Sequence, residues 1–276
     1  MPDFLEVCVE AAQAGGEVLL DWQHRFKPRE KGPKDLVTEA DVAAQEAIRG
    51  ILLRAFPDHD FLAEEEAADR KSQGLAPIPP RRSEFRWIVD PLDGTANYVH
   101  KLQNFAVSIA LEQGSELIAG CILDPISREC FTARRGGGAL LNGQAIRASQ
   151  CQSLDEAMVA VSFSANVPRG SIEITRFIEV LHAAQSVRRL GSAALNLCYV
   201  ASGRLDAYWA TSVAAWDVAA GILILREAGG IVTQVDGKPL DIEKPEMLAS
   251  CGPAVHAQAL AMLRRAEQVH RGKVEP

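Results

Sequence analysis

The chain has 276 residues, 47% of them hydrophobic, which is enough to bury a large core in one domain or in two closely packed halves. A net charge of −7 argues against a dedicated binder of nucleic acid or anionic membrane, because such proteins carry a basic face. The cysteines have no CxxC spacing, the N-terminal residues lack the basic region of a signal peptide, and no apolar run approaches membrane-spanning length. We therefore expect an ordered globular protein of the cytoplasm.

The N-terminal part of the chain predicts two amphipathic helices. Apolar residues recur at steps of three and four over residues 3–24, and Asp3 followed by Glu6 resembles a capping box. Thr38 with Asp41 offers a second helix start after a polar loop. A connection rich in proline and arginine then leads to the first predicted strand.

Strand signals dominate the next stretch of the chain. Apolar runs that are bounded by Gly- and Pro-marked turns predict strands at 85–89, 105–111, 116–123 and 129–133. Consecutive runs of this kind favour an antiparallel meander. The block Gly136-Gly137-Gly138 could cradle a phosphate, but no Lys-Ser/Thr pair follows it, so a hairpin turn is the simpler interpretation.

Beyond residue 150 the pattern changes to strands that alternate with helices. These elements are expected at 157–163, 172–184, 187–190, 192–202, 205–209 and 218–227. The order predicts an N-terminal α+β half, 1–145, joined to a C-terminal α/β half, 146–276, in one compact unit.

Asp90 and Asp93 stand where the first predicted strand ends, because Pro91 should halt its ladder before the turn at Gly94. Two carboxylates so close in a turn can converge on one small volume, where their repulsion calls for a cation or a shifted pKa. Carboxylates, free carbonyls and the Thr95 hydroxyl are ligands that suit a hard ion such as Mg²⁺. The alternative is a simple turn, since Asp, Pro and Gly are the commonest turn formers.

Two further segments place acidic residues near the start of an element. Glu64-Glu65-Glu66 follows an apolar strand-like pair and would by itself be a solvated charge run. Asp217 follows Trp216 at the start of an apolar helix and would by itself be an N-cap. None of the histidines lies at ligand spacing from another, so zinc chemistry is disfavoured.

In this order, the segments resemble the inositol monophosphatase family over nearly the whole chain. The segments that carry the resemblance are 31–41, 64–65, 90–97, 216–221 and 227–230. The resemblance implies the layered αβαβα sandwich that is typical of inositol monophosphatases and fructose-1,6-bisphosphatases. It also implies Mg²⁺-dependent, lithium-sensitive hydrolysis of a small phosphorylated metabolite, and assembly as a homodimer.

The resemblance further implies the roles of individual residues. The ligands of two or three Mg²⁺ ions would be Glu64, Asp90, Asp93, Asp217 and the backbone carbonyl of Leu92. Such ions would lower the pKa of the attacking water and stabilise the leaving alkoxide, and no phosphoenzyme intermediate is required. Asp90 counts among the catalytic residues as well.

The remaining catalytic and loop residues follow from the same match. Thr95, with Glu64, would orient the attacking water, and Asp41 would hydrogen-bond Thr95. The N–H groups of Gly94 and Thr95 would hold phosphate oxygens at the start of a helix. Lys31 would lie in a loop over the metals. The substrate-binding residues implied by the resemblance are Asp93, Gly94, Thr95, Gly191, Ser192, Ala193, Ala210 and Asp217.

The chain departs from the family at one position that matters for specificity. Members that act on inositol phosphates usually have a Glu where this chain has Ala210, and the change removes one polar contact to the non-phosphate part of the substrate. Inositol 1-phosphate is the leading substrate, with fructose 1,6-bisphosphate, histidinol phosphate and a 3′,5′-bisphosphonucleotide as alternatives. A protein-binding regulator that keeps the fold is an alternative of another class.

Overall fold

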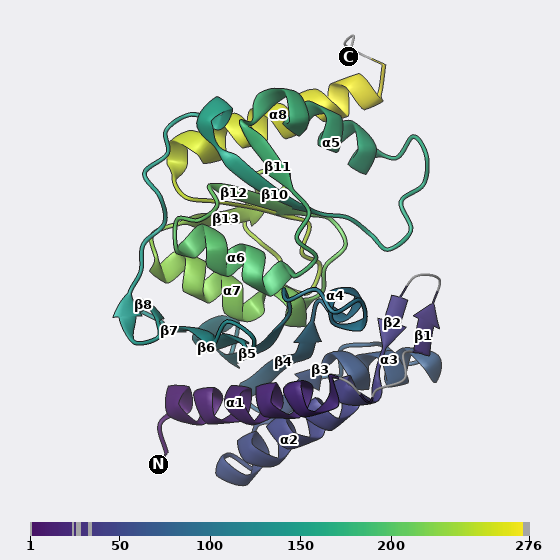
Figure 1. The fold of residues 1–276 in the computed structure, drawn as a ribbon, viewed down its shortest axis with the longest axis vertical. Coiled ribbons are helices and arrows are strands. Elements are labelled where there is room, and N and C mark those ends of the chain that lie inside the picture. Colours follow the sequence, from purple (N-terminus) through teal and green to yellow (C-terminus); the bar gives the residue numbers. More distant parts are fainter. Residues whose placement is uncertain (1, 24, 26–28, 33–34, 273–276) are drawn as a thin grey trace.

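The computed structural model describes residues 2–23, 25, 29–32 and 35–272, and these residues fold into alternating layers of helices and sheets (Figure 1). From bottom to top in Figure 1, a helix pair is followed by a seven-stranded sheet, a second helix pair, a five-stranded sheet and a third helix pair. The predicted αβαβα sandwich of the α+β class is confirmed.

The helix pairs are α1 (Phe4–Trp22) with α2 (Glu39–Ala55), α6 (Ala193–Ala201) with α7 (Ala215–Glu227), and α5 (Ile172–Ala183) with α8 (Pro253–His270). The two N-terminal helices begin where the sequence predicts. The Asp3 side chain accepts hydrogen bonds from the N–H groups of Leu5 at 2.9 Å and Glu6 at 3.0 Å. Thr38 and Asp41 form a capping box at the start of α2.

The seven-stranded sheet is antiparallel except where its first two strands run parallel. Its strands, in spatial order, are β3 (Asp60–Ala63), β4 (Phe85–Asp93), β5 (Ala106–Gln113), β6 (Glu116–Asp124), β7 (Glu129–Arg134), β8 (Gly138–Leu141) and β9 (Gln144–Ala145). The predicted antiparallel meander is therefore confirmed as β5, β6 and β7. A separate two-stranded ribbon consists of β1 (Arg29–Gly32) and β2 (Asp35–Val37).

The five-stranded sheet mixes parallel and antiparallel pairs. Its strands, in spatial order, are β11 (Ser186–Arg188), β10 (Met158–Ser162), β12 (Ala207–Ala210), β14 (Met247–Ser250) and β13 (Ile231–Gln234). The first three strands are parallel, and β14 is antiparallel to both of its neighbours. This confirms the predicted alternation of strands and helices, whereas β13, β14 and α8 lie beyond the last element that the sequence predicted.

The strands of the two sheets come from the two halves of the chain that the sequence predicted. Every described strand of the seven-stranded sheet ends by residue 145, and every strand of the five-stranded sheet begins after it. Helix α7 packs against strands of both sheets. The division at 145/146 stays a prediction, because α7 lies in the shared core between the halves.

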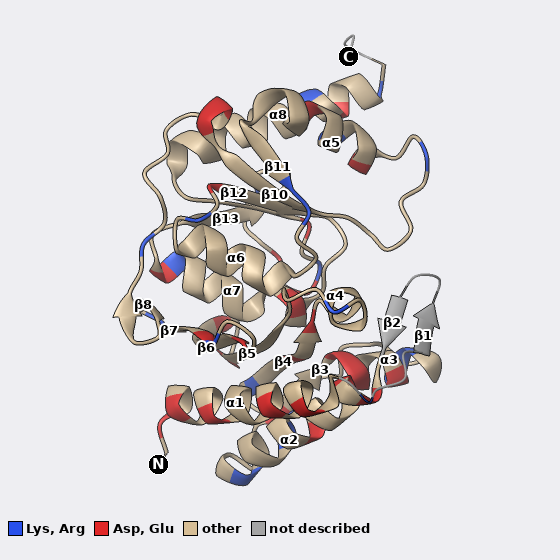
Figure 2. Ribbon diagram, viewed as in Figure 1, with Lys and Arg blue, Asp and Glu red and all other residues tan. Residues whose placement is uncertain are grey.

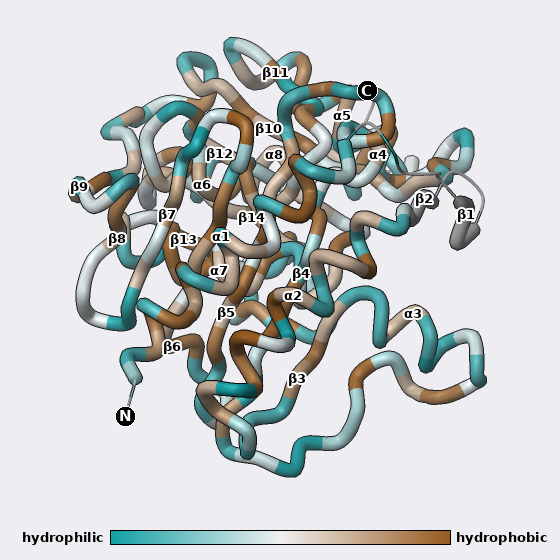
Figure 3. Tube along the Cα trace, turned by 60° about the horizontal axis from the view of Figure 1, so that its bottom comes forward, coloured by the Kyte–Doolittle hydropathy of each residue, from teal (hydrophilic) through white to brown (hydrophobic). Residues whose placement is uncertain are grey.

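Helix α7 fits between the sheets because small residues allow close approach. A Cβ atom on Gly221 would lie 2.6 Å from Cβ of Leu197 in α6, and one on Gly120 of β6 would lie 3.2 Å from Cα of Ala220. The described residues of α7 from Val218 to Leu225 are all buried. In Figure 3, hydrophobic segments lie mostly in the interior of the molecule and hydrophilic segments lie mostly on the peripheral turns.

No helix in the described part of the chain is long and apolar enough to cross a membrane.

Replacement of Gly221 by Ala tests the close packing of α7. The added methyl group overlaps Leu197 near its backbone, so we expect Gly221→Ala to lower the free energy of unfolding by about 1–3 kcal/mol, measured in urea. Gly50→Ala is the matched control, because Gly50 is exposed within α2 and the nearest atom to an added Cβ lies 3.9 Å away. This control should be stabilised by about 0.5–1 kcal/mol. Equal stabilisation of both variants would contradict the packing.

Candidate functional site

Strands β3 and β4 bring two carboxylates to the same edge of the seven-stranded sheet. The strands are parallel, and Ala63 pairs with Val89. Glu64 and Asp90 directly follow these two residues and therefore lie at the same end of the strand pair. Glu64 begins α3 (Glu64–Ser72), and Asp90 is buried with 2% of its surface exposed. Residues distant in sequence thus meet at the ends of neighbouring strands.

Strand β4 continues through the proline that was expected to end it. The register of its pairing with β5 shifts between Asp90 and Asp93, as in a β-bulge, and this irregularity accommodates Pro91, which has no N–H to donate. The N–H of Leu92 donates to Oδ1 of Asp90 at 2.9 Å. The expectation of a strand that ends at Val89 with exposed carboxylates is therefore wrong, because both aspartates lie in the strand and are buried.

Gly94 makes the turn from β4 into the short helix α4 (Thr95–Val99). Its φ of 93° lies in the left-handed region, and a Cβ atom there would lie 3.0 Å from the carbonyl oxygen of Asn104. Glycine satisfies both constraints. The first N–H groups of a helix lack intrahelical partners, so the expected phosphate contacts of Gly94 and Thr95 agree with this geometry and stay a prediction.

The Thr95 hydroxyl lies between a carbonyl and a buried carboxylate. Its Oγ1 is 3.1 Å from the Leu92 carbonyl oxygen and 3.4 Å from Oδ1 of Asp41, so the predicted Asp41–Thr95 contact is present. Oδ2 of Asp41 accepts hydrogen bonds from the N–H of Thr38 at 2.8 Å and from its hydroxyl at 2.5 Å. The cap of α2 thus orients Asp41, and Asp41 in turn helps to orient Thr95.

Asp93 connects the two halves of the chain. Its carboxylate accepts hydrogen bonds from the N–H groups of Ala193 at 3.1 Å and Ala194 at 3.0 Å, and from the Ser192 hydroxyl. Ser192 also caps α6, since its Oγ accepts from the N–H of Leu195 at 3.1 Å. The structure therefore brings Asp93, Ser192 and Ala193 together as expected, through contacts with one another, while their contacts with a substrate stay a prediction.

Gly191 lies directly before this cap and against α4. Its φ is 88°, and an added Cβ atom would lie 2.8 Å from Nδ2 of Asn97. The same Nδ2 donates to the carbonyl oxygens of Asn104 at 2.7 Å and Leu190 at 2.8 Å. Gly191 therefore allows the loop before α6 to pack closely on α4, next to Asp93.

Asp217 lies in the first turn of α7, not at its N-cap. Helix α7 begins at Ala215, and Oδ2 of Asp217 accepts a hydrogen bond from the N–H of Ala214 at 2.7 Å. Ser108 of β5 donates to the Trp216 carbonyl oxygen at 3.3 Å, which ties this turn to the seven-stranded sheet. The simple N-cap interpretation of Asp217 is wrong, because Ala214 occupies that position.

Electrostatics show that these acidic side chains interact. Burial raises the pKa of Asp90 well above its usual range, and the charges of Glu64, Asp93 and Asp217 raise it further. Burial also raises the pKa of Asp93 to about 6 and that of Asp217 well above its usual range. In Figure 2 acidic segments gather where β4, α4 and α7 approach one another. A cation at this place would relieve the repulsion among the carboxylates.

The donor atoms suit Mg²⁺, whereas their arrangement is not that of a coordination shell. All the acidic groups offer oxygen, the ligand that Mg²⁺ prefers. Within the described ranges, no group of three Asp, Glu, His or Cys side chains is placed so that it could hold a metal ion. The Asp93 carboxylate accepts a hydrogen bond from an N–H group of α6, and one oxygen of Asp217 accepts a hydrogen bond from the N–H of Ala214. The assignment of Glu64, Asp90, Leu92, Asp93 and Asp217 as ligands therefore stays a prediction.

Of the remaining expected site residues, one is not tested by the structure and another is fully buried. Lys31 belongs to β1, and its side chain lies outside the described part of the chain. Ala210 ends β12 and has no exposed surface, so its side chain could contact a substrate only if the segments around it moved. Next to it, sequence reasoning missed Glu173, whose carboxylate accepts a hydrogen bond from the Thr211 hydroxyl. A glutamate in the first turn of a helix suggests only a favourable dipole contact.

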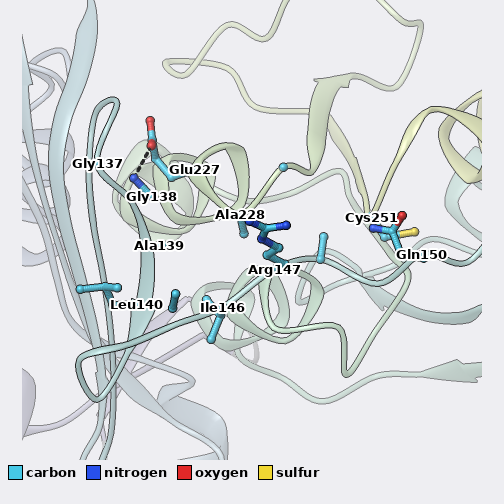
Figure 4. A pocket seen from close by; sticks show the side chains of 13 residues that line it. Gly137, Gly138, Ala139, Leu140, Ile146, Arg147, Gln150, Glu227, Ala228 and Cys251 are labelled. Carbon is cyan, nitrogen blue, oxygen red and sulfur yellow. Dashed lines mark hydrogen bonds between the residues drawn. The ribbon is translucent and has the colours of Figure 1, made fainter.

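The glycine block is a hairpin turn, as the sequence suggested, and it binds a carboxylate of the chain itself. The N–H groups of Gly136 and Gly138 donate to the two oxygens of Glu227 at 2.8 Å each. A pocket of about 430 Å³ adjoins this contact, and Arg147 lines it (Figure 4). These glycine amides are therefore occupied and do not form a phosphate cradle.

Comparison with known proteins gives consistent results. A family model described as the inositol monophosphatase family matches residues 2–268. An inositol-1-monophosphatase of Mesorhizobium japonicum is 40% identical over 84% of this chain and 86% of its own length. The Nus factor SuhB of Pseudomonas aeruginosa is 36% identical over 90% of this chain and 92% of its own. The structure of an inositol monophosphatase from Anabaena (Nostoc) superposes with a TM-score of 0.82 at 35% identity, covering 95% of each chain.

The raised pKa of Asp90 predicts that its charge destabilises the metal-free protein. The stability that this group contributes is complete below the unfolded pKa of about 3.9 and is lost as the pH rises through the higher folded pKa. In a chelator at pH 8, Asp90→Asn should therefore raise the free energy of unfolding, because the amide has no charge to bury beside the other carboxylates. Urea titrations from pH 4 to pH 8 measure the effect.

The gain of Asp90→Asn should shrink as the pH falls to 4, where the wild-type carboxyl is protonated in the folded state and about half protonated in the unfolded state. Asp69→Asn is the control, because Asp69 is exposed, and it should not reproduce this pH-dependent gain. A variant less stable than the wild type at pH 8 would show that charge repulsion does not govern the site.

Proposed function

The chain belongs to the inositol monophosphatase family, and from this premise we propose that it hydrolyses a small phosphomonoester with Mg²⁺, with inositol 1-phosphate as the first candidate. The observation that carries the proposal is that burial and the charge of Glu64 raise the pKa values of Asp90, Asp93 and Asp217 beside a helix start. Concentrated negative charge beside the first N–H groups of a helix suits a site where cations and a phosphate bind together.

In this proposal the oxygens of Glu64, Asp90, Asp93, Asp217 and the Leu92 carbonyl would hold the metal. When bound, Mg²⁺ lowers the pKa of a water molecule and neutralises charge on the transferred phosphoryl group. Phosphate-monoester hydrolysis depends on such charge neutralisation and on in-line positioning more than on a covalent nucleophile. No Ser, Cys or His side chain is needed for attack.

The chain's own residues would position the reactants. Thr95, whose hydroxyl contacts Asp41 and the Leu92 carbonyl, can orient a water molecule through the same oxygen. Glu64, which begins α3 beside Asp90, would accept a proton from that water. The N–H groups of Gly94 and Thr95 would bind phosphate oxygens. For Thr95, the contacts with Asp41 and the Leu92 carbonyl hold the side chain in place for this role.

The substrate beyond its phosphate group is the open part of the proposal. Because Ala210 lacks a polar side chain, fructose 1,6-bisphosphate, histidinol phosphate and a 3′,5′-bisphosphonucleotide are alternatives to inositol 1-phosphate. A relative named Nus factor SuhB favours a second candidate, a regulator that binds another protein through the same fold. Release of phosphate from a panel of phosphomonoesters with Mg²⁺ separates the enzyme from the regulator. Assembly as a homodimer stays a prediction.

Two glutamates in the first turn of α3 test the proposed metal site. We expect Glu64→Gln to lower kcat by more than about tenfold, a change of about 1.4 kcal/mol, because a charged ligand and proton acceptor is lost. Glu66→Gln is the matched control in the same turn, since Glu66 forms an ion pair with Arg49 and has no proposed part in the site. Stopped assays of released phosphate measure both. Equal activity of the two variants would refute the role of Glu64.

The choice of cation tests the chemistry of the donor set. Activity should require Mg²⁺ and fall when Ca²⁺ replaces it, because the larger ion relaxes the octahedral geometry. Family membership further predicts inhibition by Li⁺. Phosphate release is assayed in chelator with each ion added back, and undiminished activity in excess chelator would exclude the proposed mechanism.

A further inference from the structure

Strands β10 and β12 form a topological switch point of the five-stranded sheet, because they are parallel neighbours whose connections leave on opposite faces. Ser162 pairs with Ala210 at their carboxyl ends. From β10 the chain continues to α5 on the outer face of the sheet, and from β12 it continues to α7 on the face toward the other sheet (Figure 1). In open α/β sheets, ligands bind outside the carboxyl ends of the strands at such a switch point.

One buried carboxylate accepts hydrogen bonds from both of the segments that follow β10 and β12. Glu173, in the first turn of α5, accepts hydrogen bonds from the Ser164 N–H at 3.3 Å and the Ser164 hydroxyl at 3.0 Å, just after β10. It also accepts one from the Thr211 hydroxyl, directly after β12. The side chain is 8% exposed. Glu173 therefore lies beside Ala210, where the chain lacks a carboxylate of its own.

The described hydrogen bonds of Glu173 do not use all of its acceptor positions. An ionised carboxylate has about four acceptor positions, and the described contacts of Glu173 use three of them. Within the described residues Glu173 has no ion pair, so its charge is balanced by neutral hydroxyl and amide donors alone. A further hydroxyl group would satisfy the remaining position, whereas a second phosphate would meet a like charge.

In the sequence, the carboxyl end of β12 lies shortly before the turn that holds Asp217. From Thr211 a segment of a few residues leads to Ala214, whose N–H holds Asp217. A substrate whose phosphate lies near Asp217 could therefore direct its remaining atoms toward the carboxyl ends of β10 and β12.

We propose that Glu173 is a specificity-determining residue that accepts a hydrogen bond from a hydroxyl group of the substrate's non-phosphate part. The inference rests on the proposed function and narrows it to monophosphates of polyhydroxylated compounds. Ser164 and Thr211 hold the carboxylate in place for this contact. In this role Glu173, from α5, supplies the polar group that Ala210 does not.

The test compares Glu173→Gln with Glu179→Gln. Both glutamates lie on α5 and are 8% exposed, but Glu179 pairs with Arg265 at 2.8 Å and not with the segments that follow β10 and β12. Each variant is assayed with inositol 1-phosphate, fructose 1,6-bisphosphate and 4-nitrophenyl phosphate, which has no sugar-like hydroxyl group. Thermal unfolding of each variant shows whether the fold is kept.

We expect Glu173→Gln to lower kcat/KM for inositol 1-phosphate about tenfold, mainly through KM, because a hydrogen bond to a charged group is replaced by one to a neutral group. The value for 4-nitrophenyl phosphate should change less than about twofold, and that for the bisphosphate should rise relative to both. Glu179→Gln should leave all three ratios unchanged.

An equal loss on every substrate, or no change on any, would overturn the role of Glu173 and leave the proposed function intact. Failure of the wild-type protein to hydrolyse any of the three substrates would instead overturn the proposed function. If Glu173→Gln does not fold, Thr211→Val removes one donor to Glu173 without a change in charge. This variant must lower the preference for inositol 1-phosphate over 4-nitrophenyl phosphate, and an unchanged preference would overturn the inference.

Discussion

Repulsion among buried carboxylates is the constraint on which the site depends. Glu64, Asp90, Asp93 and Asp217 come from distant parts of the sequence. Burial and the charge of Glu64 oppose the ionisation of the three aspartates. Backbone N–H groups offset part of this cost, because Leu92 donates to Asp90, α6 donates to Asp93, and the turn before α7 donates to Asp217. The fold thus places carboxyl groups where their ionised forms are unfavourable. A bound divalent cation would stabilise the ionised forms.

The layered architecture explains why both halves of the chain are needed. Asp93 belongs to the seven-stranded sheet, but its hydrogen bonds come from the start of α6 in the other half. Asp217 belongs to α7, and its turn is tied by Ser108 to the seven-stranded sheet. Both middle helices therefore begin at the site, and their close packing, which Gly221 permits, fixes the distance between the sheets. Substrate specificity can then vary at the edge of the five-stranded sheet without a change in the acidic site.

Local signals predicted the parts of this structure that depend on local chemistry. The caps at Asp3 and Thr38, the meander, and the alternation of strands and helices follow from capping residues, apolar periodicity and turn formers. The burial of Asp90 in a bulged strand was not predictable, because Pro91 usually ends a ladder and only pairing with β5 keeps it in the sheet. Glu173 was missed for a similar reason, since its partners lie in other segments. Helix α8 was not predicted, although a glycine followed by a proline at the first helical position is a typical helix start.

Diffraction from crystals soaked in Mn²⁺ tests directly whether the acidic cluster is a divalent-cation site beside a phosphate-binding turn. Mn²⁺ prefers the same oxygen ligands as Mg²⁺ and scatters anomalously. We expect an anomalous peak within about 2.5 Å of oxygens from at least two of Glu64, Asp90, Asp93 and Asp217, a distance typical of hard cations. In the same crystals, added phosphate should bind at the N–H groups of Gly94 and Thr95. Ordered Mn²⁺ elsewhere on the molecule, with no peak in this cluster at saturating concentration, would contradict the proposed metal site.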